Sequence, residues 1–404
     1  MEKPLCKTEL NPYRVDVLDG IRALSILLVL WFHVWQQSWL APLVRLPFSE
    51  RIISFDCVPR AGFLFVDMLL LLSAFCLFLP HARAMVLGEP VPSVGVFYRK
   101  RLARIVPSYW FAVLVIFLCF SLPSGVYAGD EKGMWTDILS TMTFTQTFFP
   151  KILLGTRING ALWTAAVEMQ FYLLFPFLAY CFRRKTTLTY VVMVSVSMAY
   201  LFFVALPDTE KLRYLLNQLP GFFGVFANGM LAAYVYVLLC KTTTRKLWLS
   251  IPATLVSLGC IVLIVRMLKS APAVSPVQVW QASHRYYQSI VFALFVLSSA
   301  LSLGAFRFLL SNRVMVFLAS VSYNLYIWHQ WLAVRLKEWH IPYWEGEQPP
   351  NLTGDAVWQR KYTWIVIGVS LAVAALVTLL VEKPLAKQIN RIPVSRTARG
   401  MERD

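Results

Sequence analysis

Ionisable residues lie inside long apolar segments of this chain, where burying them is costly and usually marks a site. The segment from 17 to 36 carries Asp19 and Arg22 near its start and His33 near its end. Arg22 and His33 are separated by about three helical turns, so a helix places both on one face, about 16 Å apart along its axis. One helix is therefore predicted to direct two polar groups into the same interior.

Three more such residues lie at a depth comparable to that of His33. Counted along their segments, Asp67, Glu168 and His329 each fall roughly 9 Å from the same predicted boundary. An imidazole beside a carboxylate is the arrangement that general acid/base chemistry needs, so we predict that His33 pairs with Glu168 or Asp67. The alternative is that each group makes one interhelical hydrogen bond and only holds the helices together.

The composition indicates the elements that position these residues. Hydrophobic residues make up 58% of the 404 residues and charged residues only 15%, which is unlike a soluble globular protein. The sequence predicts an all-α polytopic membrane protein, a single bundle of about 10 transmembrane helices. The predicted spans are 17–36, 61–80, 105–122, 162–182, 188–206, 219–240, 248–268, 287–306, 314–335 and 362–382.

The basic residues predict the orientation of the bundle. Lys and Arg are in excess at the ends of the chain and in the loops on the same side, so both termini are predicted to be cytoplasmic. The net charge of +17 comes mostly from these loops. A nucleic-acid partner is not predicted, because the sequence shows no basic soluble domain. We expect a cytoplasmic tail at 1–16, a transmembrane domain at 17–386 and a basic cytoplasmic tail at 387–404. The cysteines show no metal-ligand spacing.

Six short motifs follow one another along the chain and together resemble a known family. They are Leu18-Asp19-Gly20-x-Arg22 with His33, Phe65-Val66-Asp67 with Leu72-Ser73-Ala74-Phe75, Arg101-x-x-Arg104-Ile105-x-Pro107, Asn159-Gly160-x-Leu162-Trp163 with Val167-Glu168-x-Gln170-Phe171-Tyr172, Ser322-Tyr323-x-Leu325-Tyr326-x-Trp328-His329, and Glu382-Lys383-Pro384. The set resembles the acyltransferase 3 family of membrane acyltransferases. Ala74 replaces the usual Gly of that family, and Met169 stands where a second Glu is common.

The resemblance implies transfer of an acyl group, most often acetyl from a cytoplasmic coenzyme A thioester, to a hydroxyl of a carbohydrate or glycan. It implies His33 as the general base, with Glu168, Asp67 and Arg22 in the catalytic set. Many relatives carry an added esterase-like domain, whereas this chain stops soon after its last predicted helix. A covalent acyl-histidine route stays open beside direct transfer.

Residues that would bind the two substrates can also be named. Acyl-CoA is polyanionic, and Arg99, Lys100, Arg101 and Arg104 cluster at the predicted cytoplasmic mouth. Positive-inside topology alone also accounts for such a cluster, but the spacing of Arg101 and Arg104 puts both on one helix face. The expected acceptor-binding residues are Asn159, Trp163, Tyr172, His329 and Tyr323.

Two other function classes fit a polytopic bundle with buried charges. A proton-coupled transporter of an acyl or sugar compound would use the same acids and histidines as a relay, but no repeated half is visible in the sequence. A degenerate binder of acyl-CoA or sugar is the third. The expected partners are acyl-CoA, a glycan acceptor, the lipid bilayer and a second copy in a homo-oligomer, with no permanently bound cofactor or metal. The expected location is a bacterial cytoplasmic membrane.

Overall fold

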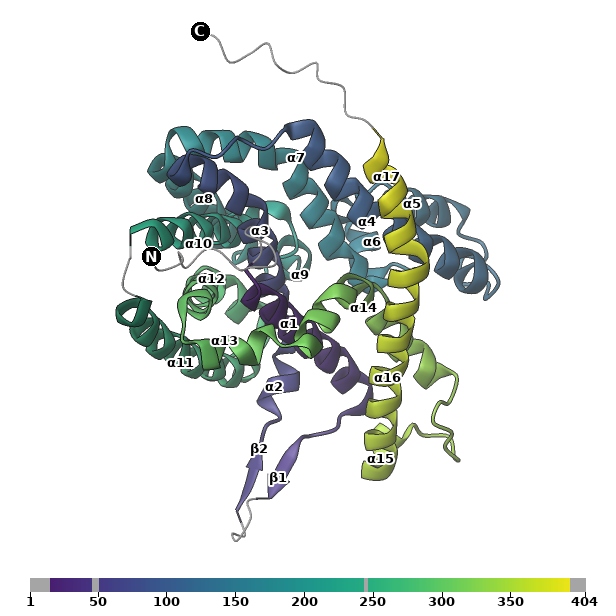
Figure 1. Cartoon of the computed structure of the whole chain (residues 1–404). Helices are drawn as coiled ribbons and strands as arrows, with labels where there is room; N and C mark the ends of the chain where they lie inside the picture. Colours follow the sequence, from purple (N-terminus) through teal and green to yellow (C-terminus); the bar gives the residue numbers. More distant parts are fainter. Residues whose placement is uncertain (1–14, 46–50, 243–245, 393–404) are drawn as a thin grey trace.

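The long helices of the bundle surround the predicted site. The computed structural model describes residues 15–45, 51–242 and 246–392 (Figure 1). Its long helices are α1 (Val17–Ser38), α3 (Phe65–Leu87), α4 (Val94–Ile116), α7 (Trp163–Arg184), α8 (Thr186–Tyr200), α10 (Phe223–Thr242), α11 (Lys246–Ser270), α12 (Val277–Leu301), α14 (Arg313–Glu338) and α16 (Ala356–Val377).

Short elements join the long helices. The short helices are α2 (Cys57–Arg60), α5 (Glu131–Met142), α6 (Pro150–Gly155), α9 (Leu212–Leu215), α13 (Gly304–Ser311), α15 (Pro350–Thr353) and α17 (Lys383–Arg391). The two strands β1 (Leu43–Arg45) and β2 (Ile52–Ser54) pair antiparallel and project from one end of the bundle (Figure 1). The all-helical expectation missed this hairpin, because each strand is only three residues long and fully exposed and so has no buried face to reveal it.

The predicted count of ten spans is only partly reproduced. Eight helices of the described residues are long and apolar enough to cross a membrane, or nine if α12 and α13 form one broken span. These two helices meet at 111°, so the predicted span 287–306 is continuous only as far as Leu301. The predicted span 314–335 is a helix, α14, that is not apolar enough to be counted. Its buried face carries Ser322, Asn324 and His329, which are the residues of a polar interior.

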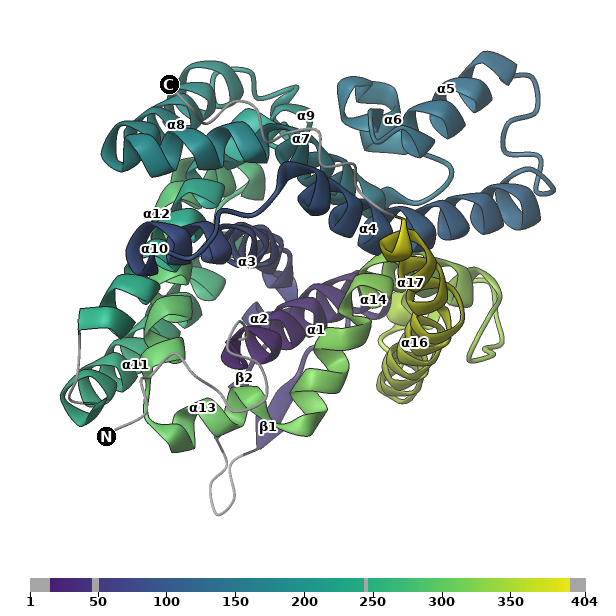
Figure 2. The same ribbon diagram turned by 45° about the horizontal axis from the view of Figure 1, so that its top comes forward.

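Helix α1 lies at the centre of the bundle, beside α3 and α14 (Figure 2). Two glycines let neighbouring segments approach closely. A Cβ on Gly20 would overlap the backbone carbonyl of Leu310 in α13, and a Cβ on Gly62 would overlap that of Leu28 in α1. These two contacts hold α1 against α13 and against the segment that precedes α3. The polar side chains of α1 therefore face cavities between helices and not lipid.

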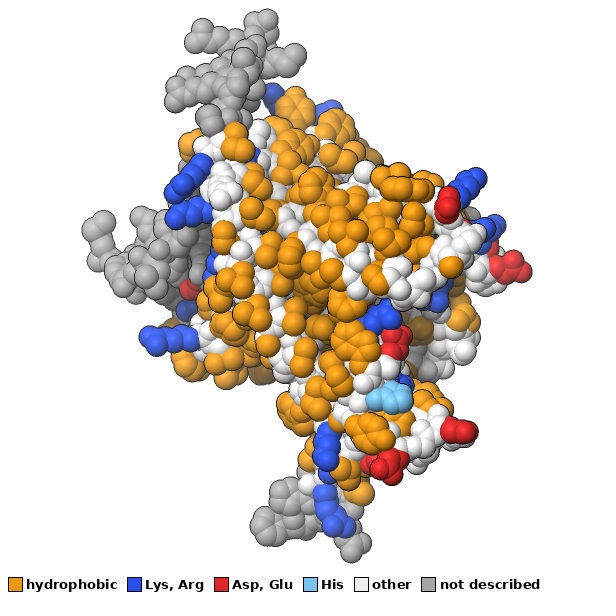
Figure 3. Space-filling model, turned by 90° about the vertical axis from the view of Figure 1, so that its right-hand side faces the viewer, with side chains coloured by type: hydrophobic (Ala, Val, Ile, Leu, Met, Phe, Trp, Pro, Cys, Tyr) orange, Lys and Arg blue, Asp and Glu red, His pale blue; other side chains and the backbone are white. Residues whose placement is uncertain are grey.

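The outer helices present apolar side chains to their surroundings. Trp364 of α16 is 71% exposed, and only 28% of the most apolar stretch of α16 is buried, compared with 78% for α3. Figure 3 shows hydrophobic side chains over the middle of one face, with charged side chains toward its margins. A surface of this kind is suited to a hydrocarbon solvent, and it leaves α3 and α1 to form the interior.

The start of α4 and the end of α17 lie at the same end of the bundle. The Arg99 guanidinium donates a hydrogen bond to the backbone carbonyl of Ile392 over 2.5 Å, and α4 packs along α17. The hairpin projects from the opposite end of the bundle, and it directly follows α1 in the chain (Figure 1). The end of α1 therefore leads toward the hairpin end of the bundle.

Candidate functional site

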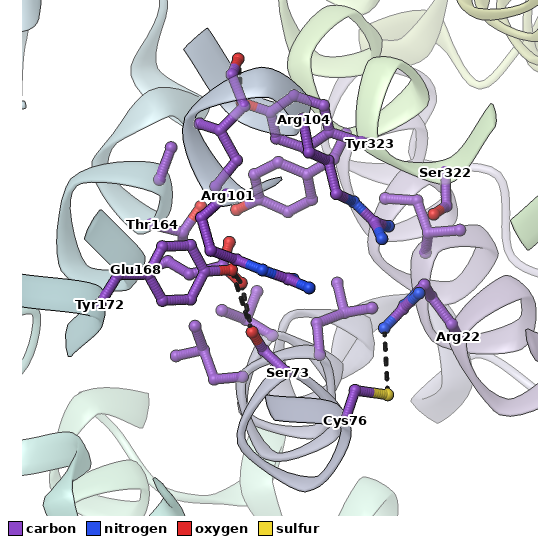
Figure 4. Close-up of a pocket in the computed structure, with 17 residues that line it drawn as sticks. Arg22, Ser73, Cys76, Arg101, Arg104, Thr164, Glu168, Tyr172, Ser322 and Tyr323 are labelled. Carbon is purple, nitrogen blue, oxygen red and sulfur yellow. Dashed lines mark hydrogen bonds between the residues drawn. The ribbon is translucent and has the colours of Figure 1, made fainter. Parts of the chain in front are cut away.

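A cavity of about 160 Å³ lies beside the first half of α1, and we name it the arginine cavity. The Arg22, Arg101 and Arg104 side chains extend into it from α1 and α4 (Figure 4). The other residues that line it are Ile26, Val66, Leu69, Leu70, Ser73, Cys76, Ile105, Thr164, Ala165, Glu168, Tyr172, Ser322, Tyr323 and Tyr326. Three guanidinium groups and one carboxylate give this cavity a net positive charge.

The three guanidinium groups are held mainly by weak contacts. Arg22 Nη2 donates to the Cys76 sulfur at 3.8 Å, and the Arg101 guanidinium lies 6.0 Å from the centre of the Tyr172 ring. The salt bridges between described residues all lie elsewhere in the protein. Arg101 and Arg104 are three residues apart on α4, which places both on the face toward the cavity. Their donors are therefore available to an anionic ligand.

Glu168 is held by two hydroxyl groups from opposite helices. Ser73 of α3 and Tyr172 of α7 both donate to its Oε1 at 2.5 Å, and the two hydroxyl oxygens are 3.2 Å apart (Figure 4). Tyr172 follows Glu168 by four residues, the spacing at which side chains meet on a helix. This cluster holds the Glu168 carboxylate opposite the arginines. The predicted pair of His33 with Glu168 is therefore not formed, because hydroxyl groups already bind that carboxylate.

A second and larger cavity, of about 580 Å³, lies beside the last turns of α1, and we name it the histidine cavity. His33 lines it together with aromatic, amide and charged side chains. The other residues that line it are Phe32, Trp35, Gln36, Arg60, Phe63, Val66, Asp67, Gly160, Ala161, Trp163, Arg213, Leu216, Asn217, Pro272, Val277, Gln278, Gln281, Tyr326 and Gln330. Its volume is in the range of about 300–1,000 Å³ typical of small-molecule sites.

The hydrogen bonds of His33 and His329 define which ring nitrogens carry protons. His329 Nδ1 lies 2.7 Å and 3.1 Å from the carbonyl oxygens of Tyr326 and Leu325, which can only accept, so Nδ1 carries the proton. His33 Nδ1 lies 2.8 Å from Gln36 Oε1, which assigns its proton in the same way. The two rings are 5.0 Å apart, and each has an unprotonated Nε2. The His33 Nε2 is thus a base at the wall of the histidine cavity.

Asp67 lines the same cavity, but its carboxylate is bound to another residue. Asp67 Oδ2 lies 3.3 Å from Arg285 Nε in α12, and these side chains are 2% and 1% exposed. Arg285 also donates to the Leu216 carbonyl at 2.7 Å and lies over the Phe222 ring. The prediction that Asp67 could pair with His33 is therefore wrong in this structure, because a buried cation more than two hundred residues away in the chain occupies the carboxylate.

The two cavities share part of their walls. Val66 of α3 and Tyr326 of α14 line both of them, and the cavities follow one another along α1 from Arg22 to His33. Val66 and Tyr326 therefore lie at the boundary between the two cavities, and we name this shared wall the junction.

The residues predicted to bind the acceptor do not all line the same cavity. Tyr172 and Tyr323 line the arginine cavity, and Trp163 lines the histidine cavity. His329 is fully buried behind His33 and lines neither cavity. Asn159 lines neither cavity, and its side chain accepts a hydrogen bond from the Ala161 N–H and donates one to the Ile327 carbonyl.

Two of the residues predicted to bind acyl-CoA lie outside the arginine cavity. Arg99 is bound to the Ile392 carbonyl, and Lys100 is exposed. Conversely, several residues that line the histidine cavity were not predicted from the sequence, among them Gln36, Arg60 and Arg213. Gln36 could have been found, because it lies one helical turn after His33. Arg60 and Arg213 lie on short helices that carry no motif.

Comparisons with known proteins assign the chain to a family. Residues 15–381 match the family described as the acyltransferase domain. The O-acetyltransferase OatA of Staphylococcus aureus is 22% identical over 370 residues, which cover 84% of this chain and 53% of OatA. The putative acetyltransferase ORF330 of Acidianus two-tailed virus is 26% identical over 318 residues, covering 78% and 82% of the two chains.

A third relative is the acyltransferase MdmB of Streptomyces mycarofaciens, 25% identical over 164 residues, covering 40% of this chain and 38% of MdmB. This chain spans about half the length of the OatA relatives. No solved structure matches it. The family match covers nearly all of the described helices, including every residue that lines either cavity. The chain therefore belongs to the acyltransferase 3 family and is a multi-pass integral membrane protein.

Proposed function

We propose that this protein transfers an acyl group from acyl-CoA, bound in the arginine cavity, to a hydroxyl of a carbohydrate acceptor in the histidine cavity. The observation that carries the proposal is the junction at Val66 and Tyr326, where a cavity lined by three arginines meets one lined by His33. Acetyl is the proposed acyl group, because two of the relatives are named acetyltransferases.

The size and charge of the arginine cavity suit one part of the donor. A volume of about 160 Å³ is below the range of about 300–1,000 Å³ typical of small-molecule sites, so this cavity would enclose only part of the donor, such as a segment of the pantetheine arm of CoA. Arg101 and Arg104 would bind phosphate oxygens at the end of that arm, where planar guanidinium groups form paired hydrogen bonds. Arg22 would hold the arm closer to the junction, with Glu168 orienting polar groups opposite it.

The transfer step uses the unprotonated Nε2 of His33. This nitrogen takes the proton from the acceptor hydroxyl as its oxygen attacks the thioester carbonyl carbon. A new C–O ester bond forms, the C–S bond breaks, and the CoA thiolate leaves and takes the proton from His33. Tyr326 lines both cavities, so its hydroxyl is the proposed donor of a hydrogen bond to the carbonyl oxygen as negative charge develops on it.

The donor would enter from the cytoplasm. The arginine cavity lies toward the end of the bundle where α4 starts and α17 ends, and that end carries many of the basic residues. By the positive-inside rule this end is cytoplasmic, which places both chain ends on that side and the histidine cavity toward the outer side. A bacterial cytoplasmic membrane is the proposed location.

The test is a transfer assay with purified protein in lipid nanodiscs. Radiolabelled acetyl-CoA is mixed with candidate glycans, and the glycans are then separated and counted. We expect label in an alkali-labile ester on an acceptor. Label that crosses the membrane of proteoliposomes without becoming covalently bound would contradict the proposal and favour a transporter.

A variant at the junction tests directly whether the shared wall at Val66 is needed for transfer. Val66→Trp fills the wall that the two cavities share, so transfer should be lost while the donor and the acceptor each still bind. Val191→Trp on the exposed face of α8 is the matched control and should transfer normally. Normal transfer by Val66→Trp would show that the acyl group does not pass through the junction.

A further inference from the structure

The walls of the histidine cavity combine flat aromatic surfaces with side-chain amides. Trp35 and Trp163 contribute aromatic faces, and five amide side chains, Gln278 and Gln330 among them, contribute groups that both donate and accept hydrogen bonds. Hydroxyl groups of a sugar also donate and accept, and the apolar face of a sugar ring packs on an indole ring. The tryptophan and amide side chains are uncharged, so they suit the ring and its hydroxyls, whereas an ionic group would need one of the charged side chains of the same cavity.

The charged side chains of this cavity are neutralised unequally. The carboxylate of Asp67 is paired with the buried Arg285 at 3.3 Å. Arg60 is tied to Asp56 by a salt bridge of 2.6 Å and lies 5.1 Å from the centre of the Trp35 ring. Arg213 is exposed at the rim, and in the described part of the chain no salt bridge involves it.

The segment that carries Arg213 is held in place by buried contacts. Leu212 and Leu216 on either side of it pack with Ala282 in a separate hydrophobic cluster. The nearby acid Asp208 is occupied by Lys211, whose ammonium lies 3.2 Å from one carboxylate oxygen and whose backbone N–H donates to the other. These hydrogen bonds hold the pKa of Asp208 below its ordinary value, so it stays charged and engaged. Arg213 is therefore an exposed cation, carried on an anchored segment, that lines the cavity.

We propose that the acceptor is an acidic saccharide, in which a carboxylate or phosphate group binds Arg213 while the sugar ring lies against the tryptophans beside His33. This inference rests on the proposed function and adds the chemical class of the acceptor. A guanidinium binds either oxyanion through charge-assisted hydrogen bonds. Arg60, already paired with Asp56, shapes the rim beside Trp35 and contributes less to this recognition.

The test compares matched ligands on the purified protein in nanodiscs of neutral lipid. The ligands are an oligosaccharide that contains a uronic acid, the same oligosaccharide with its carboxyl reduced to an alcohol, and a counterpart that carries a phosphate. Binding is measured by calorimetry without donor, and transfer of labelled acetyl is measured separately. The variants are Arg213→Gln, Arg213→Lys and the control Lys269→Gln, which removes an exposed cation that does not line the cavity.

We expect at least one acidic ligand to bind about 10 to 100 times more tightly than the reduced ligand, the range that hydrogen bonds to a charged group provide. Arg213→Gln should remove most of that preference and leave binding of the reduced ligand unchanged. Arg213→Lys should keep part of the preference, and Lys269→Gln should keep all of it. Which acidic ligand shows the dependence on Arg213 identifies the oxyanion.

Several results would overturn the inference. The acidic and reduced ligands could bind equally, or none of the ligands could bind. Arg213→Gln could also weaken binding of the acidic and reduced ligands equally. Binding that depends on Arg213 without label transfer would uphold the acidic site and contradict the acyltransferase reaction, whereas equal transfer to both ligands would uphold the reaction and contradict the acidic site.

Discussion

The arginine cavity and the histidine cavity lie along the same helix, α1, yet they are built differently. The arginine cavity is small and draws three cations from two helices, whereas the histidine cavity is more than three times larger and is lined by aromatic and amide groups. Arg22 belongs to one and His33 to the other. One transmembrane helix thus lines both a small cavity rich in cations and a large cavity rich in aromatic and amide groups, the two proposed sites for donor and acceptor.

The two cavities also treat their buried carboxylates differently. Glu168 is held by two hydroxyl groups and faces open space near the arginines. The negative charge of Asp67 is neutralised by the buried Arg285 guanidinium. A carboxylate held by hydroxyls can still act on a ligand, while one locked in a buried ion pair mainly holds its helices together. The difference favours a role in the reaction for Glu168 and a role in positioning helices for Asp67, which variants of the two residues can test.

The largest effect is expected when the base is removed from the histidine cavity. His33→Ala should lower the rate of acyl transfer by about 10² to 10⁴, the usual contribution of a general base. Binding of CoA in the arginine cavity should not change, because His33 does not line it. The measurement pairs the label-transfer assay with a CoA binding isotherm.

The matched control for that variant is His284→Ala. His284 is an exposed imidazole stacked on Trp280 in α12, and it lines neither cavity. It should transfer at the wild-type rate. Wild-type turnover by His33→Ala would remove the chemical distinction between the two cavities, since the base would then have to be elsewhere.

The arginine cavity should show the opposite pattern. Arg101→Ala combined with Arg104→Ala should weaken acyl-CoA binding by about 100-fold, because two charge-assisted hydrogen bonds are lost at about 1.5 kcal/mol each, the low end of their usual contribution. Affinity for the acceptor should stay the same. The measurement is the KM for acetyl-CoA beside the affinity for the acceptor, with Arg360→Ala on the exposed start of α16 as the control. A change confined to the acceptor would reverse the assignment of the cavities.

The sequence predicted the arginine side of this comparison better than the histidine side. Arg101 and Arg104 could be placed on one face by spacing alone, and Arg22 belongs to a recognisable motif. The family match and the membrane-spanning helices confirm the expected class of protein. Local periodicity and short motifs therefore define most of the helices and one of the two cavities.

Contacts between segments that are distant along the chain could not be predicted from the sequence. Nothing near Asp67 indicates that Arg285, on another helix, is its partner, because a buried ion pair depends on how α3 and α12 pack. Arg213 lies on a four-residue helix that no periodic pattern predicts. The break of 111° between α12 and α13 was likewise hidden within a continuous apolar segment. Tertiary packing decides each of these features.

The Asp67–Arg285 pair offers a way to separate positioning from catalysis. Asp67→Asn leaves a buried guanidinium without its counter-charge, so the protein should lose about 3–5 kcal/mol of stability, with a moderate fall in transfer. The double variant Asp67→Leu with Arg285→Met removes both charges and should recover much of the stability. Thermal unfolding in detergent and label transfer are measured on both.

The transfer rate of the double variant decides between the two roles. If the pair only positions α3 and α12, activity should return along with stability. A double variant that unfolds at the wild-type temperature but remains inactive would show that the Asp67 carboxylate acts on the substrate. Asp67 would then stand beside Glu168, and the contrast between the two carboxylates would be lost.

The smallest effect is expected at the cluster around Glu168. Ser73→Ala removes one of the two hydroxyls that donate to Glu168 Oε1 and leaves the Tyr172 hydroxyl in place. A single hydrogen bond contributes about 1 kcal/mol, so transfer should fall about fivefold. Ser320→Ala is the control, because that exposed hydroxyl donates only to the Phe317 carbonyl in the same helix. If the carboxylate contributes only to the donor side, the loss should appear in the KM for acetyl-CoA and not in the affinity for the acceptor. A loss on the acceptor side would mean that Glu168 reaches across the junction, and the two cavities would then have to be treated as one site.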